Sequence, residues 1–224
     1  TGFGKAGGLF YFEKFNVIPD ILIVSKSFGG GKSSISAFIA NKKTLTKSYG
    51  NLNDALLHST TYNGFGEECI TAISSINLLI SKKYYLNGKI IEKNFKKYFK
   101  NFPLKYSSKI KEQRGLGAMF GFILYTKFLP IKKIQKLLPI SVLKDKKFLD
   151  KLLASALLDE LYEKYKILAT IKFNQEVILC IEPNLIISKK ELDYCVKSFD
   201  KLFQQNFDKI IIKFILKSFK RKIS

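Results

Sequence analysis

One lysine in this sequence has the neighbours that a covalent catalyst needs. Lys26 follows a short apolar run, Ile21 to Val24, and precedes the glycine run 29–31. A lysine at the end of a buried strand has little solvent to share, and desolvation favours the neutral, nucleophilic amine. Glycines let a ligand approach the backbone closely. The arrangement therefore suits a lysine that forms a Schiff base with a carbonyl compound.

Two other interpretations of residues 19–36 stay open from the residues alone. Gly31-Lys32-Ser33 looks like the end of a phosphate-binding loop, but that pattern needs a glycine at position 26, where the chain has Lys26. The simpler alternative is a glycine-rich turn with lysines pointing at water, because glycine clusters mark loops more often than sites. The apolar run 35–40 predicts a second strand, so the loop would join two strands late in a large α/β domain.

Hydroxyl groups precede a second predicted element, a helix. Thr60 and Thr61 carry the hydroxyls, Gly64 and Gly66 open the backbone, and apolar residues then follow at helical spacing: Ile70, Ile73, Ile76, Leu79 and Ile80. Hydroxyls beside a helix N-terminus suit a phosphate ester. Simple N-capping is the alternative, with residues 67 and 68, both glutamate, favourably placed in the first turn.

The remaining elements that must position these residues follow an α+β pattern. Residues 82–102 predict a lysine-rich helical stretch, and residues 147–165 an amphipathic helix. Strands and one further helix are predicted at the following ranges: strands at 109–114, 116–124, 167–173 and 177–181, and a helix at about 189–203.

Charge and composition limit the class of partner. The formal net charge is +21, yet only Arg114 and Arg221 are arginines, so 37 of the 39 basic residues are lysines. Arginine is the residue that reads bases and phosphates bidentately. Because the lysines are also spread along the chain, we expect solvated lysine faces and no specific nucleic-acid partner.

Three cysteines and the absence of long apolar runs bear on the compartment. Cys69, Cys180 and Cys195 lie in apolar stretches without metal-ligand spacing, so we expect buried thiols in a reducing compartment. No apolar run is long enough for a membrane span and no secretory signal is visible, so we expect a cytoplasmic protein.

The stretch 208–224 places lysines at helical spacing among apolar residues; it suits either an anionic membrane surface or packing against the body of the protein.

Four blocks, in one order along the chain, resemble the class III aminotransferases, which are pyridoxal-phosphate enzymes of the ornithine and acetylornithine aminotransferase type. The blocks are Thr1–Phe10 with Phe12-Glu13, Val17–Ile21 and Ser25–Gly31; His58–Tyr62; Arg114–Gly121; and Ile181–Pro183 with Ile187-Ser188 and Glu191–Asp193. The resemblance implies an α/β fold of fold type I, aspartate aminotransferase-like. It assigns residues 1–82 to the end of the large cofactor-binding domain, 83–204 to a small α+β C-terminal domain, and 205–224 to a basic amphipathic tail.

The resemblance also implies a cofactor and the residues that hold it. Lys26 matches the lysine that binds pyridoxal 5'-phosphate as a Schiff base and then acts as general acid and base. Thr61 matches a threonine that contacts the cofactor phosphate across a homodimer interface. The implied reaction moves an amino group from an amine or amino acid donor to a keto or aldehyde acceptor.

Two positions depart from the family pattern. Many members have Gly-Gly-Asn-Pro where this chain has residues 63–66, Asn-Gly-Phe-Gly. In amino-acid-specific members an arginine that grips the substrate carboxylate stands two residues before the Glu-Pro pair, and here that residue is Cys180. A cysteine cannot form that charge-assisted fork. The substrate carboxylate is then held elsewhere, or the donor is an amine without one, or the chain has decayed.

The first residue, Thr1, falls inside a family motif, so we expect a C-terminal fragment. The resemblance would place the aspartate that pairs with the pyridinium nitrogen, the aromatic that stacks on the ring and the main phosphate loop before Thr1. We therefore expect the full-length protein to be a transaminase and this chain alone to be inactive. The alternatives are an aminomutase or decarboxylase-like enzyme of the same family, and an inactive basic fragment that binds nucleic acid or membrane.

Overall fold

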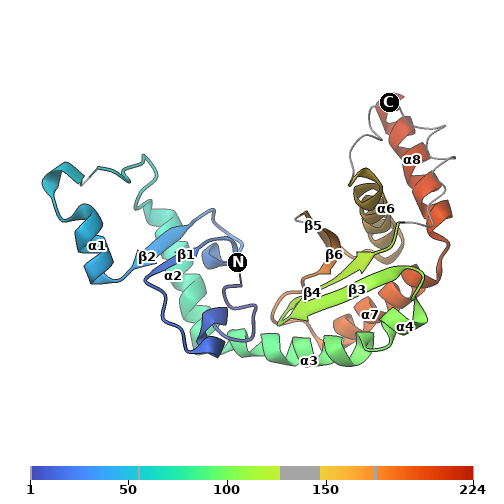
Figure 1. Cartoon of the computed structure of the whole chain (residues 1–224), viewed down its shortest axis with the longest axis horizontal. Coiled ribbons are helices and arrows are strands. Elements are labelled where there is room, and N and C mark those ends of the chain that lie inside the picture. The colour runs from blue at the N-terminus through green and yellow to red at the C-terminus, as the bar shows by residue number, and fades with distance from the viewer. Residues whose placement is uncertain (1, 55, 127–146, 174–175, 224) are drawn as a thin grey trace. The chain divides into compact units, whose positions relative to one another are not determined.

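The computed structural model describes residues 2–54, 56–126, 147–173 and 176–223, with the side chains of residues 220–223 set aside (Figure 1). Thr1 of the first motif and Ser224 of the tail lie outside the described residues. The chain divides into two compact units, Thr1–Ile90 and Ile91–Ser224. Both units mix helices and strands, as expected for an α/β chain.

The first unit contains a pair of short antiparallel strands. Strand β1 (Ile21–Val24) pairs with β2 (Ala37–Ala40), with Val24 opposite Ala37. Strand β1 has the predicted bounds, whereas β2 begins two residues later than predicted. Serines at positions 34 and 36 occupy the approach to β2, and serine favours local side-chain hydrogen bonds over strand pairing.

Helices and 3-10 turns make up the rest of the first unit. Helix α2 (Gly66–Ser81) matches the predicted helix. Helix α1 (Lys42–Tyr49) lies in a stretch for which no element was predicted. It is capped at its start by the Asn41 side chain, which accepts a hydrogen bond from the Thr44 backbone N–H at 2.8 Å. The 3-10 turns are η1 (Tyr11–Phe15), η2 (Lys26–Gly29), η3 (Leu52–Asp54) and η4 (Tyr84–Leu86).

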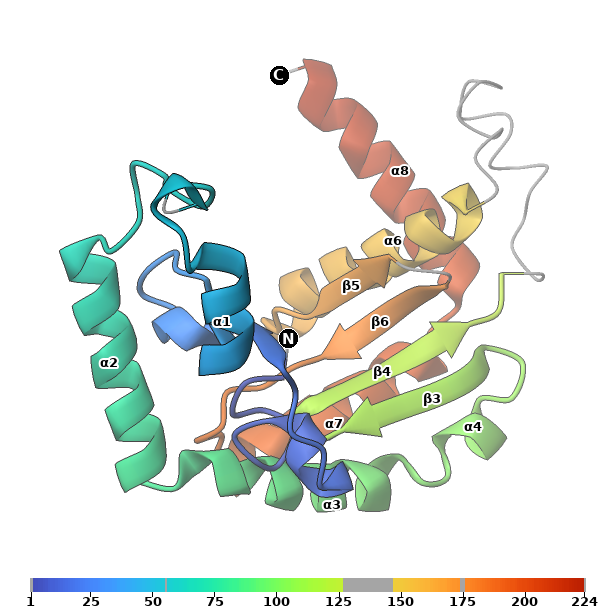
Figure 2. The ribbon, with the colours of Figure 1, turned by 60° about the vertical axis from the view of Figure 1, so that its left-hand side comes forward.

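The second unit is organised on a four-stranded antiparallel sheet with the order β3-β4-β6-β5 (Figure 2). The strands are β3 (Ile110–Leu116), β4 (Met119–Leu124), β5 (Thr170–Phe173) and β6 (Val177–Ile181). Strands β4 and β6 are central and almost wholly apolar, because both of their faces are covered. Gly117, at φ +58°, turns the β3–β4 hairpin, and its N–H donates to the Glu92 carboxylate at 2.7 Å.

Helices enclose this sheet and complete one apolar core. They are α3 (Asn87–Phe99), α4 (Phe102–Lys105), α6 (Phe148–Tyr165), α7 (Lys189–Gln204) and α8 (Phe207–Ile223). The predicted helical stretch 82–102 is thus interrupted by η4, and α3 begins only at Asn87. Aromatic rings dominate the core. For example, the centroid of the Phe99 ring lies 4.7 Å from that of Phe102 and 5.2 Å from that of Phe122.

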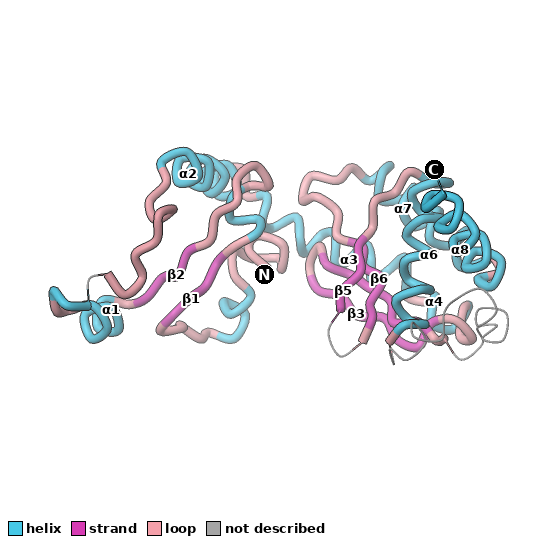
Figure 3. Tube along the Cα trace, turned by 90° about the horizontal axis from the view of Figure 1, so that it is seen from above, coloured by secondary structure: helices cyan, strands magenta, loops and turns pink. Residues whose placement is uncertain are grey.

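The basic tail belongs to this core. Helix α8 lies beside α6 (Figures 2 and 3), and its residues Ile210, Ile211 and Ile215 are buried. Two of its lysines pair with acids of α6: Lys213 with Glu160 at 2.9 Å and Lys217 with Asp159 at 2.7 Å. Packing against the body, the second of the two alternatives, is therefore what the structure shows. In the described part of the chain, no helix has both the length and the hydropathy to cross a bilayer.

Candidate active site

Lys26 lies where β1 gives way to the glycine loop. The strand ends at the buried Val24, Ser25 is extended, and Lys26 opens the 3-10 turn η2. Its backbone is in the left-handed region, at φ +57°. For an L-residue with a side chain this conformation costs about 1–2 kcal/mol. Backbone strain of this kind persists only where the surroundings impose it, and such residues cluster at functional sites.

Two elements hold the loop in this shape. On one side, the Ser27 hydroxyl donates to the Phe3 carbonyl oxygen at 3.0 Å, and the Phe28 ring packs edge-on against the Phe3 ring at 5.7 Å. On the other side, Gly30, at φ +64°, lies so close to α2 that a Cβ there would come 2.7 Å from the Ser75 hydroxyl oxygen. The N-terminal motif and α2 thus hold the loop in place, and the close approach of α2 explains why position 30 is a glycine.

A hollow of about 530 Å³ opens beside Lys26. Its lining is rich in hydroxyl groups and contains a second lysine: Ser25, Lys26, Gly31, Lys32, Ser33, Ser34, Ile35 and Ser36. The Ser33 hydroxyl is buried and has no hydrogen-bond partner among the described residues. Buried polar groups normally find a partner, so an unused hydroxyl in a cationic hollow fits an anionic ligand group such as a phosphate ester. Together with the Lys26 amine, the hollow fits a phosphorylated aldehyde.

The expectation of a desolvated lysine is wrong for this structure. The Lys26 side chain is exposed. The reason lies in the strand before it, because β1 is itself only partly covered by the described residues: Ile21 and Ile23 are 53% and 73% exposed. An exposed amine remains accessible to an aldehyde, but none of the described residues shields it from water.

Thr61 lies in the turn that precedes α2 and is exposed. Helix α2 is preceded by Phe65 and has no side-chain cap, so the N-capping alternative for Thr60 and Thr61 does not describe this helix. The Thr60 hydroxyl instead donates to the Asn63 side-chain oxygen at 3.2 Å. Thr61 is not among the residues that line the hollow beside Lys26, so this hollow does not bring the two predicted site residues together.

Cys180 is part of the sheet of the second unit. It lies on β6 opposite Gly121 and Thr170, only 6% exposed, and burial raises the pKa of its thiol to about 11. A neutral thiol cannot hold a carboxylate by charge. Lys172, on β5, is already paired with Glu182 at 3.2 Å.

The other cysteines only partly match the expectation of buried thiols. Burial raises the pKa of Cys195 to about 12, whereas Cys69 is half-buried. All three thiols are free. In the described part of the chain, no group of His, Cys, Asp and Glu is arranged to hold a metal ion.

The residues that sequence reasoning missed are the serines of the hollow. Ser33, Ser34 and Ser36 follow the glycine run directly. Three serines within four residues are the signal that the sequence offers for them, although the same stretch also resembles the end of an imperfect phosphate loop and the start of a strand.

Comparison with known proteins extends these observations to most of the chain. Residues 1–203 match the family Aminotransferase class-III. The acetylornithine aminotransferase of Methanocaldococcus jannaschii is 29% identical over 208 residues, which cover 91% of this chain and 42% of that protein. The adenosylmethionine-8-amino-7-oxononanoate aminotransferase of Buchnera aphidicola is 33% identical over 119 residues, which cover 53% of this chain and 27% of that protein.

A solved structure shows that the fold is shared as well. The ornithine aminotransferase of Toxoplasma gondii superposes with a TM-score of 0.69 at 20% identity, over 91% of this chain and 41% of that one. The expected fold, that of the fold type I transaminases, is thereby confirmed. The chain spans less than half the length of each of these relatives. A match that runs from the first residue to position 203, through every motif discussed above, places this chain in the class III aminotransferase family.

Proposed function

We propose that this chain supplies the Schiff-base lysine of a pyridoxal 5'-phosphate-dependent transaminase, and that this lysine is Lys26. One observation carries the proposal. The strained lysine at the end of β1 opens onto a hollow with serine hydroxyls and a second cation, and one of these hydroxyls is buried without a partner. The relatives named as aminotransferases support it, as does the family match across this region.

The roles of the residues follow from their chemistry. The cofactor, when bound, supplies the electron sink for the carbon from which a proton is removed. Lys26 would hold the cofactor through its amine, and the same amine would serve as the general base and acid that takes up and gives back a proton at the substrate carbon. The cationic Lys32 and the Ser33 hydroxyl are placed to receive an anionic group in the hollow.

We further propose that Thr61 acts in the neighbouring subunit of a homodimer. Thr61 is exposed and lies outside the hollow that contains Lys26, which is compatible with a role in a partner's site. Thr61→Val removes one hydroxyl donor to a charged group, worth about 1.5–3 kcal/mol. Cofactor retention should fall more than fold stability. A full-length protein that is monomeric and still retains cofactor normally would contradict this.

The substrate class is proposed from Cys180. This thiol is buried and neutral, and Lys172 is engaged with Glu182. The other nearby cation, the exposed Lys190, lacks the planar fork of an arginine, so we expect no bidentate grip on an α-carboxylate at this position. The enzyme should process an ω-amine or polyamine donor at least as well as an α-amino acid. Half-reaction kinetics with matched donors, with and without the carboxylate, decide the point. A strong preference for the carboxylated donor that is unchanged in Cys180→Ala would refute it.

We also propose that activity requires residues beyond those of this chain. The exposed side chain of Lys26 and the open face of β1 support this, because proton transfer in a transaminase benefits from a site that excludes water.

The assignment of Lys26 is tested by borohydride reduction of the full-length protein with its cofactor, followed by peptide mapping. The label should sit on the peptide that contains Lys26. Lys32→Ala is the matched control, because Lys32 lines the same hollow only six residues away. Lys26→Ala should abolish covalent attachment, and Lys32→Ala should preserve it. A label on Lys32, or no label in the unmodified protein, would sink the assignment.

A further inference from the structure

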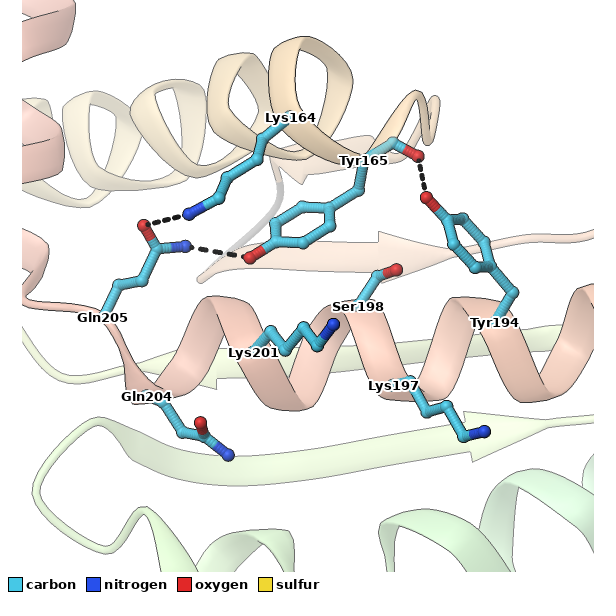
Figure 4. A pocket seen from close by; sticks show the side chains of 8 residues that line it. All are labelled: Lys164, Tyr165, Tyr194, Lys197, Ser198, Lys201, Gln204 and Gln205. Atoms are coloured by element: carbon cyan, nitrogen blue, oxygen red, sulfur yellow. Dashed lines mark hydrogen bonds between the residues drawn. The ribbon is translucent and has the colours of Figure 1, made fainter.

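A second cationic cavity lies in the other unit, in the groove between α6 and α7 (Figure 4). Its volume is about 600 Å³, within the range of roughly 300–1,000 Å³ that is typical of small-molecule sites. Three lysines contribute to its lining, with no aspartate or glutamate: Lys164, Tyr165, Tyr194, Lys197, Ser198, Lys201, Gln204 and Gln205.

Two of the lysines on α7 lie close enough together to repel each other. Lys197 and Lys201 stand four residues apart on one helix, where like charges repel. Among the described residues neither forms an ion pair, although the lysines of α8 do. The acid nearest in sequence, Asp200, is already hydrogen-bonded to the Lys105 ammonium at 2.7 Å and to the Tyr106 hydroxyl at 2.6 Å.

The opposite wall adds Lys164, whose ammonium lies 3.9 Å from the Glu160 carboxylate at the edge of ion-pair distance, and polar groups in fixed positions. Lys164, on α6, donates to the Gln205 side-chain oxygen at 3.4 Å, and the Gln205 amide donates to the Tyr165 hydroxyl at 3.2 Å. The Tyr194 hydroxyl donates to the Tyr165 carbonyl oxygen at 2.9 Å and ties the end of α6 to α7. These hydrogen bonds, drawn in Figure 4, hold the walls of the groove in place.

A buried hydroxyl completes the lining. Ser198 is only 2% exposed, and its side chain points from α7 into the space beside Tyr165 and Tyr194 (Figure 4). A hydroxyl between two lysine-bearing walls donates to an anion without adding charge of its own.

We propose that this groove binds a small ligand with a diphosphate group. Charges on both walls favour a ligand with more than one negative charge, and lysine serves phosphate as a compact point charge. The concave shape favours a small molecule over a nucleic acid, which is contacted along an extended basic surface and is read by arginine. No arginine lines the groove.

The test is calorimetric titration of the full chain with pyrophosphate and with inorganic phosphate at 0.15 M salt, roughly the physiological ionic strength. Pyrophosphate should bind more tightly than phosphate. Lys197→Gln/Lys201→Gln should weaken pyrophosphate binding by at least about tenfold, the equivalent of about 1.4 kcal/mol. The matched control is Lys93→Gln/Lys97→Gln, which removes two exposed lysines with the same spacing on α3 and should change the affinity by less than about twofold.

Further arms separate the sources of the ligand and the competing site. Tighter binding of a nucleoside diphosphate than of pyrophosphate assigns an organic ligand, and equal binding assigns the inorganic ion; both support the diphosphate site. Because the hollow beside Lys26 also offers cations to an anion, the comparison is repeated in a Lys32→Ala background, where Lys197→Gln/Lys201→Gln should produce the same loss of affinity. No pyrophosphate binding, an equal loss in the Lys93/Lys97 control, or a bound nucleic acid that pyrophosphate does not displace would each overturn the proposal.

Discussion

Gly115 in the Arg114–Gly121 motif is predicted to be required for packing. A Cβ atom at Gly115 would lie 2.0 Å from the Phe120 ring carbon Cδ2, whereas ordinary contact begins at 3.4 Å. In Gly115→Ala the ring must therefore move by about 1.4 Å. The ring cannot swing freely, because Phe95 and Phe99 lie 5.4 Å from it, between ring centroids, and are themselves buried.

The expected cost follows from this geometry. Overpacking a tight core costs typically about 1–3 kcal/mol, and a displacement of this size places Gly115→Ala near the upper end. For a unit of this length, about 3 kcal/mol corresponds to a fall in Tm of roughly 10 °C. Thermal unfolding followed by circular dichroism measures it. Gly66→Ala is the matched control, because a Cβ at Gly66 meets nothing within 4 Å; its Tm should stay within about 2 °C of the unmodified chain or rise.

A double-mutant cycle tests the cause. Phe120→Leu removes ring atoms that the new methyl group would strike, so Gly115→Ala should cost less in that background, with a coupling energy of about 1 kcal/mol or more. The reasoning is refuted if Gly115→Ala leaves the Tm within about 2 °C of the unmodified chain, or if the two changes are additive.

Three further predictions address the second unit. Ile211→Ala should lower the free energy of unfolding in urea by about 2–5 kcal/mol, because Ile211 is wholly buried. Leu216 lies on the same helix and is 48% exposed, so Leu216→Ala should cost little. Equal effects would mean that α8 does not pack on α6. Ser188→Ala should lower the free energy of unfolding by about 0.5–2 kcal/mol in the same assay, because the Ser188 hydroxyl accepts a hydrogen bond from the Glu191 backbone N–H at 3.2 Å at the start of α7. An unchanged stability would show that this cap does not stabilise the helix. Burial raises the pKa of Cys180 from 9.0 to about 11, so the contribution of this thiol to stability should be constant below pH 9 and fall as pH rises from 9 to 11, since the unfolded thiol ionises first. The decline over this range should be smaller in Cys180→Ala, and an identical pH profile would contradict the buried thiol.

The sequence alone determined the family and most of the elements, for a physical reason. Strands β1 and β6 and helices α2, α6 and α7 all carry strong local signals, because apolar periodicity and glycine or serine at their ends act within a few residues. The Lys26–Gly31 loop could be located in the same way, since glycine is the residue that most readily adopts a positive φ, as Gly30 and Gly31 do here.

Only the tertiary structure decided how these elements are covered. Whether Lys26 is desolvated depends on what lies over β1, which no local pattern contains, and there the expectation was wrong. The sequence of the basic helix α8 left membrane binding open beside packing against the body, because the acids of α6 that pair with its lysines lie more than fifty residues away in sequence. The groove of Lys164, Lys197 and Lys201 likewise exists only once α6 and α7 are placed side by side, because the lysines that line it come from separate helices.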